Sequence, residues 1–204
     1  RGLAGPRRRA RIVADEGPQR VYVFSQAGEL LSGWGGRGGG PAEFEGIRGV
    51  VPCGESGVAV LDRADLVLFD DSGALKQRLP VDYATPRITP VGVSPDCSRV
   101  LGFRRISDPP AGAVGVSVYR LYWLDPTTRG VDTLATAGFM ASWTRSLYGE
   151  VRAFPIPWGA TLYTLDATEG GVVVGDPRVP QLSFLTDDGL VTRIIRWDRP
   201  GAPV

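Results

Sequence analysis

Short runs of β-branched and aromatic residues alternate with turn-forming clusters near the start of the chain. Arg11–Asp15 and Arg20–Phe24 are two such runs, and a third spans residues 29–32. Clusters at 16–19 and 25–28, rich in Gly, Pro, Ser and Gln, separate the three runs. Apolar runs of this length between turn clusters predict a small antiparallel meander.

The same arrangement returns further along the chain with one additional strand. Four β-rich runs separated by turn residues are expected between residues 47 and 79. Phe69 lies 45 residues after Phe24, and Gly73 lies 45 residues after Gly28. Because several features share one offset, the two segments are interpreted as copies of a repeat.

Two further units are expected, at 88–138 and 160–197. In the last of them Asp176, Phe184 and Gly189 take the positions that Asp, Phe and Gly hold in the first unit. A repeat of four antiparallel strands is typical of a β-propeller blade.

The predicted fold is therefore all-β, with residues 1–204 forming a single stretch of propeller blades. The units are 10–32, which is partial, 47–80, 88–138 and 160–197. A β-sandwich is the alternative, since hairpin turns of this kind also occur there. Only residues 139–148 offer an apolar pattern that would suit a short helix.

Composition narrows the function classes. The chain has no histidine, which removes the Ser-His-Asp triad and histidine-ligated zinc sites. A net charge of +1 gives no overall field that would attract nucleic acid, so no nucleic-acid partner is expected. No run of about 18 apolar residues is present to span a bilayer.

A glycine-rich stretch at 33–44 separates the first two units and is expected to be the crossover between them. A phosphate-binding loop needs Gly-Lys-Ser/Thr leading into a helix, whereas here Gly40 is followed by Pro41 and a strand. The glycines are instead expected to let the chain turn sharply, with Phe44 packing beneath.

These residues carry a family resemblance. Residues 13–15, the run 20–24 and the crossover 36–44 resemble the NHL-type six-bladed β-propellers of bacteria, although Ala42 stands where the crossover often has Gly. The resemblance implies that the chain is a fragment of a six-bladed propeller. It also implies a periplasmic or outer-surface location.

The candidate site lies where the crossover and the loops between second and third strands share one face. Arg37, Glu43, Asp62, Arg63 and Asp65 are expected there. Grouped carboxylates of this kind can hold Ca²⁺, whereas the alternative is that each Asp caps its own turn.

Three other residues have more than one interpretation. Trp34, beside the crossover, either stacks on a ligand or wedges between blades. Cys53 and Cys97 occupy equivalent hairpins of neighbouring units, so they are either free or joined in a disulfide, which requires Cα atoms within about 7 Å.

Two functions are consistent with these features. The first is a non-catalytic scaffold, exported from the cytoplasm, that binds a protein, a glycan or a small molecule. The second is a calcium-dependent propeller hydrolase or lyase of the lactonase type. No cofactor other than Ca²⁺ is expected, and no catalytic residue is assigned.

Overall fold

A computed structural model describes residues 10–54, 57–63, 65–70, 72–81, 88–147, 150–155, 165–168, 170–176 and 181–197. This part of the chain contains sixteen strands and no helix, and therefore no helix long and apolar enough to cross a membrane. It forms two compact units. One runs to Gly102 and includes Leu124–Val131, and the other comprises Phe103–Trp123 and the residues from Asp132 onward.

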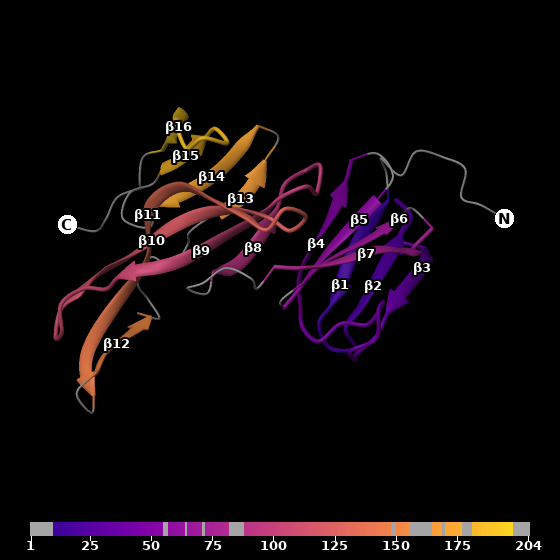
Figure 1. Cartoon of the computed structure of the whole chain (residues 1–204), viewed down its shortest axis with the longest axis horizontal. Helices are drawn as coiled ribbons and strands as arrows, with labels where there is room; N and C mark the ends of the chain where they lie inside the picture. Colours follow the sequence, from indigo (N-terminus) through magenta and orange to yellow (C-terminus); the bar gives the residue numbers. More distant parts are fainter. Residues whose placement is uncertain are drawn as a thin grey trace. The chain divides into compact units, whose positions relative to one another are not determined.

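The strands form four sheets, labelled in Figure 1, and in each sheet neighbouring strands follow one another in the chain. The first sheet contains β1 (Arg11–Asp15), β2 (Arg20–Phe24) and β3 (Leu30–Gly35); the second contains β4 (Ile47–Cys53), β5 (Gly57–Asp62), β6 (Asp65–Asp70) and β7 (Leu75–Pro80). The third contains β8 (Thr89–Val93), β9 (Val100–Ser107), β10 (Val114–Asp125), β11 (Gly130–Leu147) and β12 (Glu150–Pro155); the fourth contains β13 (Leu165–Thr168), β14 (Gly171–Asp176), β15 (Gln181–Leu185) and β16 (Val191–Arg196).

This order confirms the all-β fold of propeller-type blades. The second and fourth sheets each have four strands, and every pairing within them is antiparallel. Such a meander is the architecture of a blade.

The third sheet differs from the sequence expectation in its length. It has five strands and continues past residue 138, because β11 runs to Leu147 and pairs with β12. Residues 139–147, considered for a helix, belong to β11; pairing with neighbouring strands outweighs a local apolar pattern. The expected strand at 160–164 lies outside the described residues.

Three hairpin turns confirm the repeat. The amide of Gly28 donates to the Ser25 carbonyl over 3.0 Å, and the amide of Gly73 donates to the Asp70 carbonyl over 3.1 Å. Gly189 makes the same bond to Thr186, and the three glycines have φ values of 87°, 86° and 83°. Glycine adopts this left-handed backbone at the lowest cost, which favours it at this position of the turn.

The turns also correct one assignment in the fourth unit. Phe24 immediately precedes Ser25, and Leu185, rather than Phe184, immediately precedes Thr186. The strand pairing shifts at Leu185, as it does at Phe24. Leu185 is therefore the structural equivalent of Phe24, because each is the residue before its turn and pairs at the register shift.

The first residue of the turn differs among the three copies: it is Ser25, Asp70 or Thr186. Asp70 is the one carboxylate among them, and it accepts hydrogen bonds from the Ser72 hydroxyl and from the Ala74 amide. These hydrogen bonds, first the one from the Ser72 hydroxyl and then the one from the Ala74 amide, hold the pKa of Asp70 below its ordinary value of 3.8. Each turn thus satisfies its own backbone amides locally.

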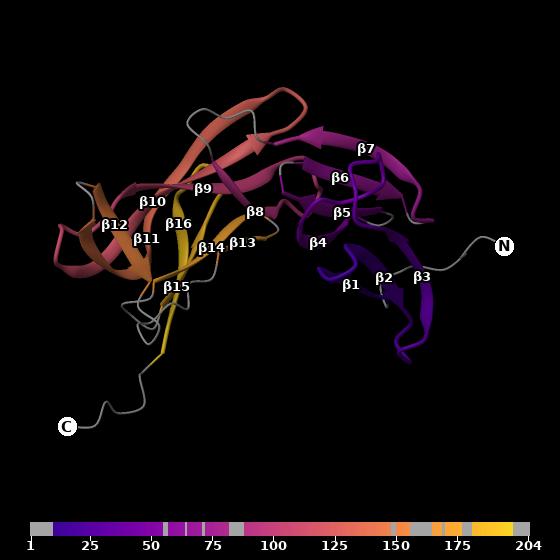
Figure 2. The same cartoon turned by 90° about the horizontal axis from the view of Figure 1, so that it is seen from below.

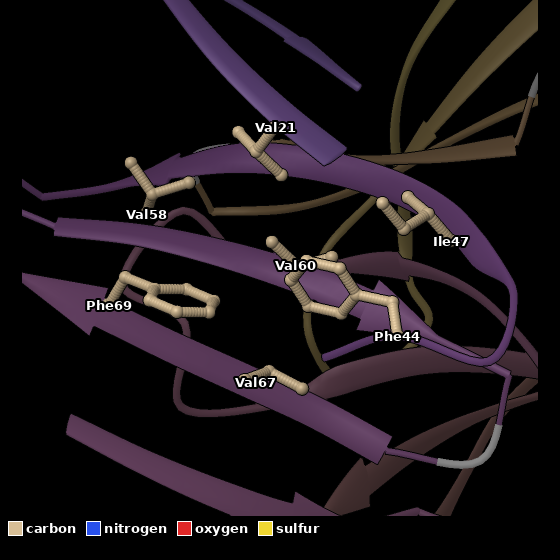
Figure 3. Packing of buried hydrophobic residues seen from close by; sticks show 7 residues of the cluster. All are labelled: Val21, Phe44, Ile47, Val58, Val60, Val67 and Phe69. Atoms are coloured by element: carbon tan, nitrogen blue, oxygen red, sulfur yellow. The ribbon is translucent and has the colours of Figure 1, made fainter. Parts of the chain in front are cut away.

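The apolar core of the first compact unit lies between the first and second sheets, which stand side by side in Figures 1 and 2. The crossover residue Phe44 has no exposed surface. Figure 3 shows its ring among the aliphatic side chains of the second sheet, with Val21 of the first sheet nearby. The ring of Phe44 also meets Phe69 edge-on, with centroids 5.9 Å apart.

Gly35 leaves the space that lets the Phe44 ring pack against the end of β3. A Cβ added at Gly35 would collide with the Phe44 ring, and the residue also has a φ of 85°. Both the space and the backbone conformation therefore demand glycine at the end of β3. The expectation that Phe44 packs beneath the crossover is confirmed.

The two cysteines form a disulfide. Cys53 ends β4 and Cys97 lies in the β8–β9 turn, with Cα atoms 5.4 Å apart. The amide of Gly54 donates to the carbonyl of Pro95 over 3.1 Å and holds the same two turns together. Of the two alternatives left by the sequence, the structure selects the disulfide.

Replacing Phe44 with Ala should lower the free energy of unfolding by about 3–5 kcal/mol, because it leaves a cavity between the two sheets. Urea denaturation measures the change. Leu31→Ala is the matched control; Leu31 is 44% exposed, so its loss should cost less than about 1 kcal/mol. Equal effects of the two variants would contradict the central role of Phe44.

Reduction of the disulfide should destabilise the fold. The bonded cysteines are 44 residues apart, and opening a loop of that size returns about 4 kcal/mol of chain entropy to the unfolded state. The urea midpoint of the wild type should therefore fall on adding a phosphine reductant. The Cys53→Ser/Cys97→Ser variant should not respond, and an equal response in both proteins would contradict the prediction.

Candidate functional site

The crossover loop, residues 36–46, connects β3 to β4 and is closed by its own backbone. The amide of Phe44 donates to the Gly36 carbonyl over 2.8 Å, and the amide of Gly38 donates to the Phe44 carbonyl over 3.2 Å. Arg37 and Phe44 form an isolated parallel bridge. The loop therefore folds back on itself above the buried Phe44 ring.

Glu43 closes the tip of the crossover loop. Its Oε2 accepts a hydrogen bond from the Gly40 amide over 2.9 Å, and its own amide donates to the Gly40 carbonyl over 3.0 Å. A Cβ at Gly38 would collide with the Glu43 carboxylate. Glu43, predicted as a ligand-binding residue, thus has a structural bond within the loop.

Arg78 of β7 lies at the centre of the polar cluster and is 24% exposed. Its Nε donates to Asp65 and its Nη2 donates to Asp62, both over 2.7 Å. Its Nη1 donates to the carbonyl of Glu43 over 2.8 Å and to that of Pro41 over 3.3 Å. One guanidinium therefore ties two carboxylates to the crossover loop, using the planar fork of donors that lysine lacks.

Asp62 anchors the end of the crossover loop. It is 1% exposed, and its Oδ1 accepts a hydrogen bond from the Gly46 amide over 2.7 Å. Its Oδ2 accepts one from the Glu45 amide over 3.2 Å as well as the bond from Arg78. Both oxygens of this buried carboxylate are thus bonded, as burial of a charge requires.

The remaining predicted residues lie around this cluster. Arg63 pairs with Glu45 over 3.6 Å, and both side chains are more than half exposed. Arg37 donates to the Gly17 carbonyl over 3.2 Å at the surface. The structure thus brings Glu43, Asp62 and Asp65 together through Arg78, whereas Arg37 is exposed on the crossover loop and Arg63 is exposed on the β5–β6 turn.

Trp34 belongs to the apolar packing between the sheets. Its ring contacts Phe69, with centroids 5.8 Å apart, and a Cβ at Gly73 would meet the indole at 2.9 Å. From the sequence, Trp34 either stacks on a ligand or wedges between blades. These contacts correspond to a wedge between sheets.

Within the described residues, no three Asp, Glu or Cys side chains gather in a way that would hold a metal ion. Asp15 accepts a hydrogen bond from the Gly17 amide over 2.9 Å, which is the turn-capping role weighed for these aspartates. The calcium expectation stays a prediction.

Two residues of the site were not found from the sequence. Gln19, 5% exposed with a φ of 58°, accepts a hydrogen bond from the Ile47 amide over 2.7 Å through its Oε1. Arg78 is the other. One feature of the sequence could have indicated Arg78. Asp62 and Asp65 form a cross-strand pair, and two like charges directly opposite each other are destabilising unless a cation lies beside them.

Replacing Arg78 with Met should lower the free energy of unfolding by about 3–5 kcal/mol, because it leaves the buried Asp62 carboxylate without its cation. Thermal and urea unfolding both report the loss. Arg63→Met is the matched control, since its exposed pair with Glu45 contributes less than about 1 kcal/mol. A loss of similar size in the control would contradict the role of Arg78.

No family model and no curated protein matches this sequence. Solved structures with a similar arrangement include a Bacteroides caccae protein of unknown function, at 8% identity and a TM-score of 0.44, covering 95% of this chain and 59% of that one. The dihydro-heme d1 dehydrogenase NirN matches at 13% identity and a TM-score of 0.43, covering 96% and 46%. A candidate exported protein of Bacteroides fragilis matches at 10% identity and a TM-score of 0.43, covering 92% and 70%.

The chain spans about half to three fifths of the first two of these proteins. Identities this low carry no information about activity. The assignment of propeller-type blades here rests on the strand order and on the repeated turns of the chain itself.

Proposed function

We propose that this chain is part of a non-catalytic binding scaffold, an NHL-type propeller that acts outside the cytoplasm. The observation that carries the proposal is the use of the candidate site's charged groups. Arg78, Asp62 and Asp65 bond to one another, and Glu43 bonds to its own loop. Groups engaged in this way support a surface; a general base or nucleophile needs a free, activated group.

The surface that they support is the outer side of the crossover loop. The exposed charged side chains of this loop are Arg37, Glu43 and Glu45, and Arg63 of the neighbouring β5–β6 turn pairs with Glu45, so the surface carries both signs. A loop held by Arg78 and Phe44 loses little further entropy on binding, which favours affinity. A protein or a glycan with polar groups is the partner class that suits such a surface.

The disulfide supports the location. Cys53 and Cys97 are bonded, and such bonds persist in the periplasm and outside cells, whereas cytoplasmic thiols are kept reduced. Trapping of thiols with an alkylating agent in the source cells should therefore label neither cysteine until a reductant is added.

Binding is tested on glycan and peptide arrays with the wild type and the Arg37→Ala/Arg63→Ala variant. The double variant should bind any array ligand of the wild type at least about tenfold more weakly, which corresponds to about 1.4 kcal/mol of binding free energy. Arg129→Ala is the control, because Arg129 is exposed in the β10–β11 turn. Equal loss in the control would contradict binding at the crossover loop.

Catalysis is tested with lactone substrates in the presence and absence of Ca²⁺. The scaffold should hydrolyse them no faster than buffer, and Ca²⁺ should produce neither heat on titration nor a rise in melting temperature. Calcium-dependent turnover would overturn the proposal in favour of a lactonase.

A further inference from the structure

A hollow of about 240 Å³ lies between β11 and the fourth sheet, within the second compact unit. Figures 1 and 2 both show β11 beside the strands of that sheet. Residues 135–138 of β11 form one wall, and the other wall comes from β14, β15 and the start of β16. Pockets for drug-sized molecules are usually about 300–1,000 Å³, so this hollow suits a smaller ligand.

One end of the hollow is closed by tight packing between its two walls. A Cβ added at Gly189, in the β15–β16 turn, would lie 1.9 Å from the carbonyl oxygen of Leu134. Leu134 is 6% exposed, and Leu185, which lines the hollow, is 8% exposed. Because the turn packs on the β11 backbone next to residues 135–138, the separation of the walls is set by the fold before any ligand binds.

Much of the lining is aliphatic. Val174 and Leu185 contribute from the fourth sheet, and Ala135 and Ala137 contribute from β11. Val174 lies opposite Ser183 in the pairing of β14 with β15, which places both side chains on one face of the sheet. The described lining residues include no aromatic ring, on which a sugar could stack, and no charged side chain. The lining therefore suits a short aliphatic chain.

Polar groups form a chain of hydrogen bonds along the fourth sheet. The Nε of Arg196 donates to the Oε1 of Gln181 over 2.8 Å, and the Nε2 of Gln181 donates to the Oγ of Ser183 over 3.0 Å. Gln181 pairs with Arg196 across β15 and β16 and lies two residues before Ser183, so all three side chains project from one face. Gln181 and Ser183 line the hollow, and Arg196 is exposed beside them.

The direction of these bonds determines what the hollow presents to a ligand. Arginine has no acceptor, so the carbonyl of Gln181 faces Arg196 and its amide nitrogen faces Ser183. That nitrogen carries a second N–H. The Ser183 hydroxyl accepts the bond from Gln181, and its own proton has no acceptor among the described residues. Thr136 adds a hydroxyl from the β11 side. Neighbouring donors of this kind match the oxygens of an acceptor group.

We propose that this hollow binds a short aliphatic carboxylate. The carboxylate accepts hydrogen bonds from Ser183 and Gln181, and the aliphatic chain lies against Val174 and Leu185. Hydrogen bonds to an ionised acceptor are stronger than those to a neutral one, and the charge of Arg196 favours an anion further. No carboxylate belongs to the described lining, so nothing there would hold an ammonium group. The site is separate from the proposed binding surface at the crossover loop, and either can fail without the other.

Calorimetric titration with pentanoate tests the ligand class. Pentanoate should bind with a dissociation constant of about 1 mM or lower, which asks for only a modest contribution from each of its few non-hydrogen atoms. Pentanamide, which has the same chain and a neutral acceptor, should bind at least about tenfold more weakly, and pentylammonium should give no heat. Absence of heat with pentanoate, or equal affinity for any two of the three compounds, would overturn the proposal.

Two variants test the position of the site. Ser183→Ala should weaken pentanoate binding at least about tenfold, because it removes one of the donors. Thr192→Ala is the matched control; its hydroxyl donates to the Phe184 carbonyl outside the hollow, and its removal should leave the affinity unchanged. Equal losses would place the ligand elsewhere and overturn the proposal.

Gln181→Glu gives a readout that loss of folding cannot produce. The new carboxylate keeps the bond to Arg196 but replaces the amide donor with an acceptor of negative charge. The variant should therefore bind pentylammonium more tightly than pentanoate, the reverse of the wild type. Retention of the preference for pentanoate would overturn the proposal.

Discussion

The burial of Phe44 between the first and second sheets is the interaction on which the described site depends. The crossover loop is rich in glycine, and ordering such a segment costs more chain entropy than ordering other residues. A fully buried aromatic ring offsets part of that cost. The buried ring also fixes the position of the loop, so that the carbonyls of Pro41 and Glu43 lie within hydrogen-bond distance of Arg78.

Arg78 also holds the loop, through hydrogen bonds and ion pairs instead of apolar burial. A buried ion pair contributes little net stability, because both charges lose their water, but removing one partner is costly. Asp62 and Arg78 are therefore interdependent, and each also bonds to backbone of the loop. Hydrophobic burial places the crossover loop, and the charged groups fix its orientation.

The sequence predicted the features that depend on local chemistry. The turns at Gly28 and Gly73 were predicted because glycine at a positive φ is a local requirement, and Phe44 was predicted because it follows the glycine-rich stretch. The role of Arg78 was not, since its partners lie 13 to 38 residues away and meet it only in the folded sheet. The disulfide was left open for the same reason: it depends on a Cα distance, which spacing in the chain does not supply.

Because the chain is built of repeated sheets, the site depends mainly on the sheets next to it. In repeat proteins each unit is stabilised mainly by its immediate neighbours. Within the described residues, the hydrogen bonds of Arg78, Asp62 and the crossover loop all come from residues 17–78. The third sheet meets this pair of sheets at the disulfide, away from the hydrogen bonds of Arg78. The surface is then a property of one pair of blades. Gly33 of β3, which pairs with Tyr22, is the counterpart of Arg78 of β7, which pairs with Val67, so the first sheet lacks this arginine.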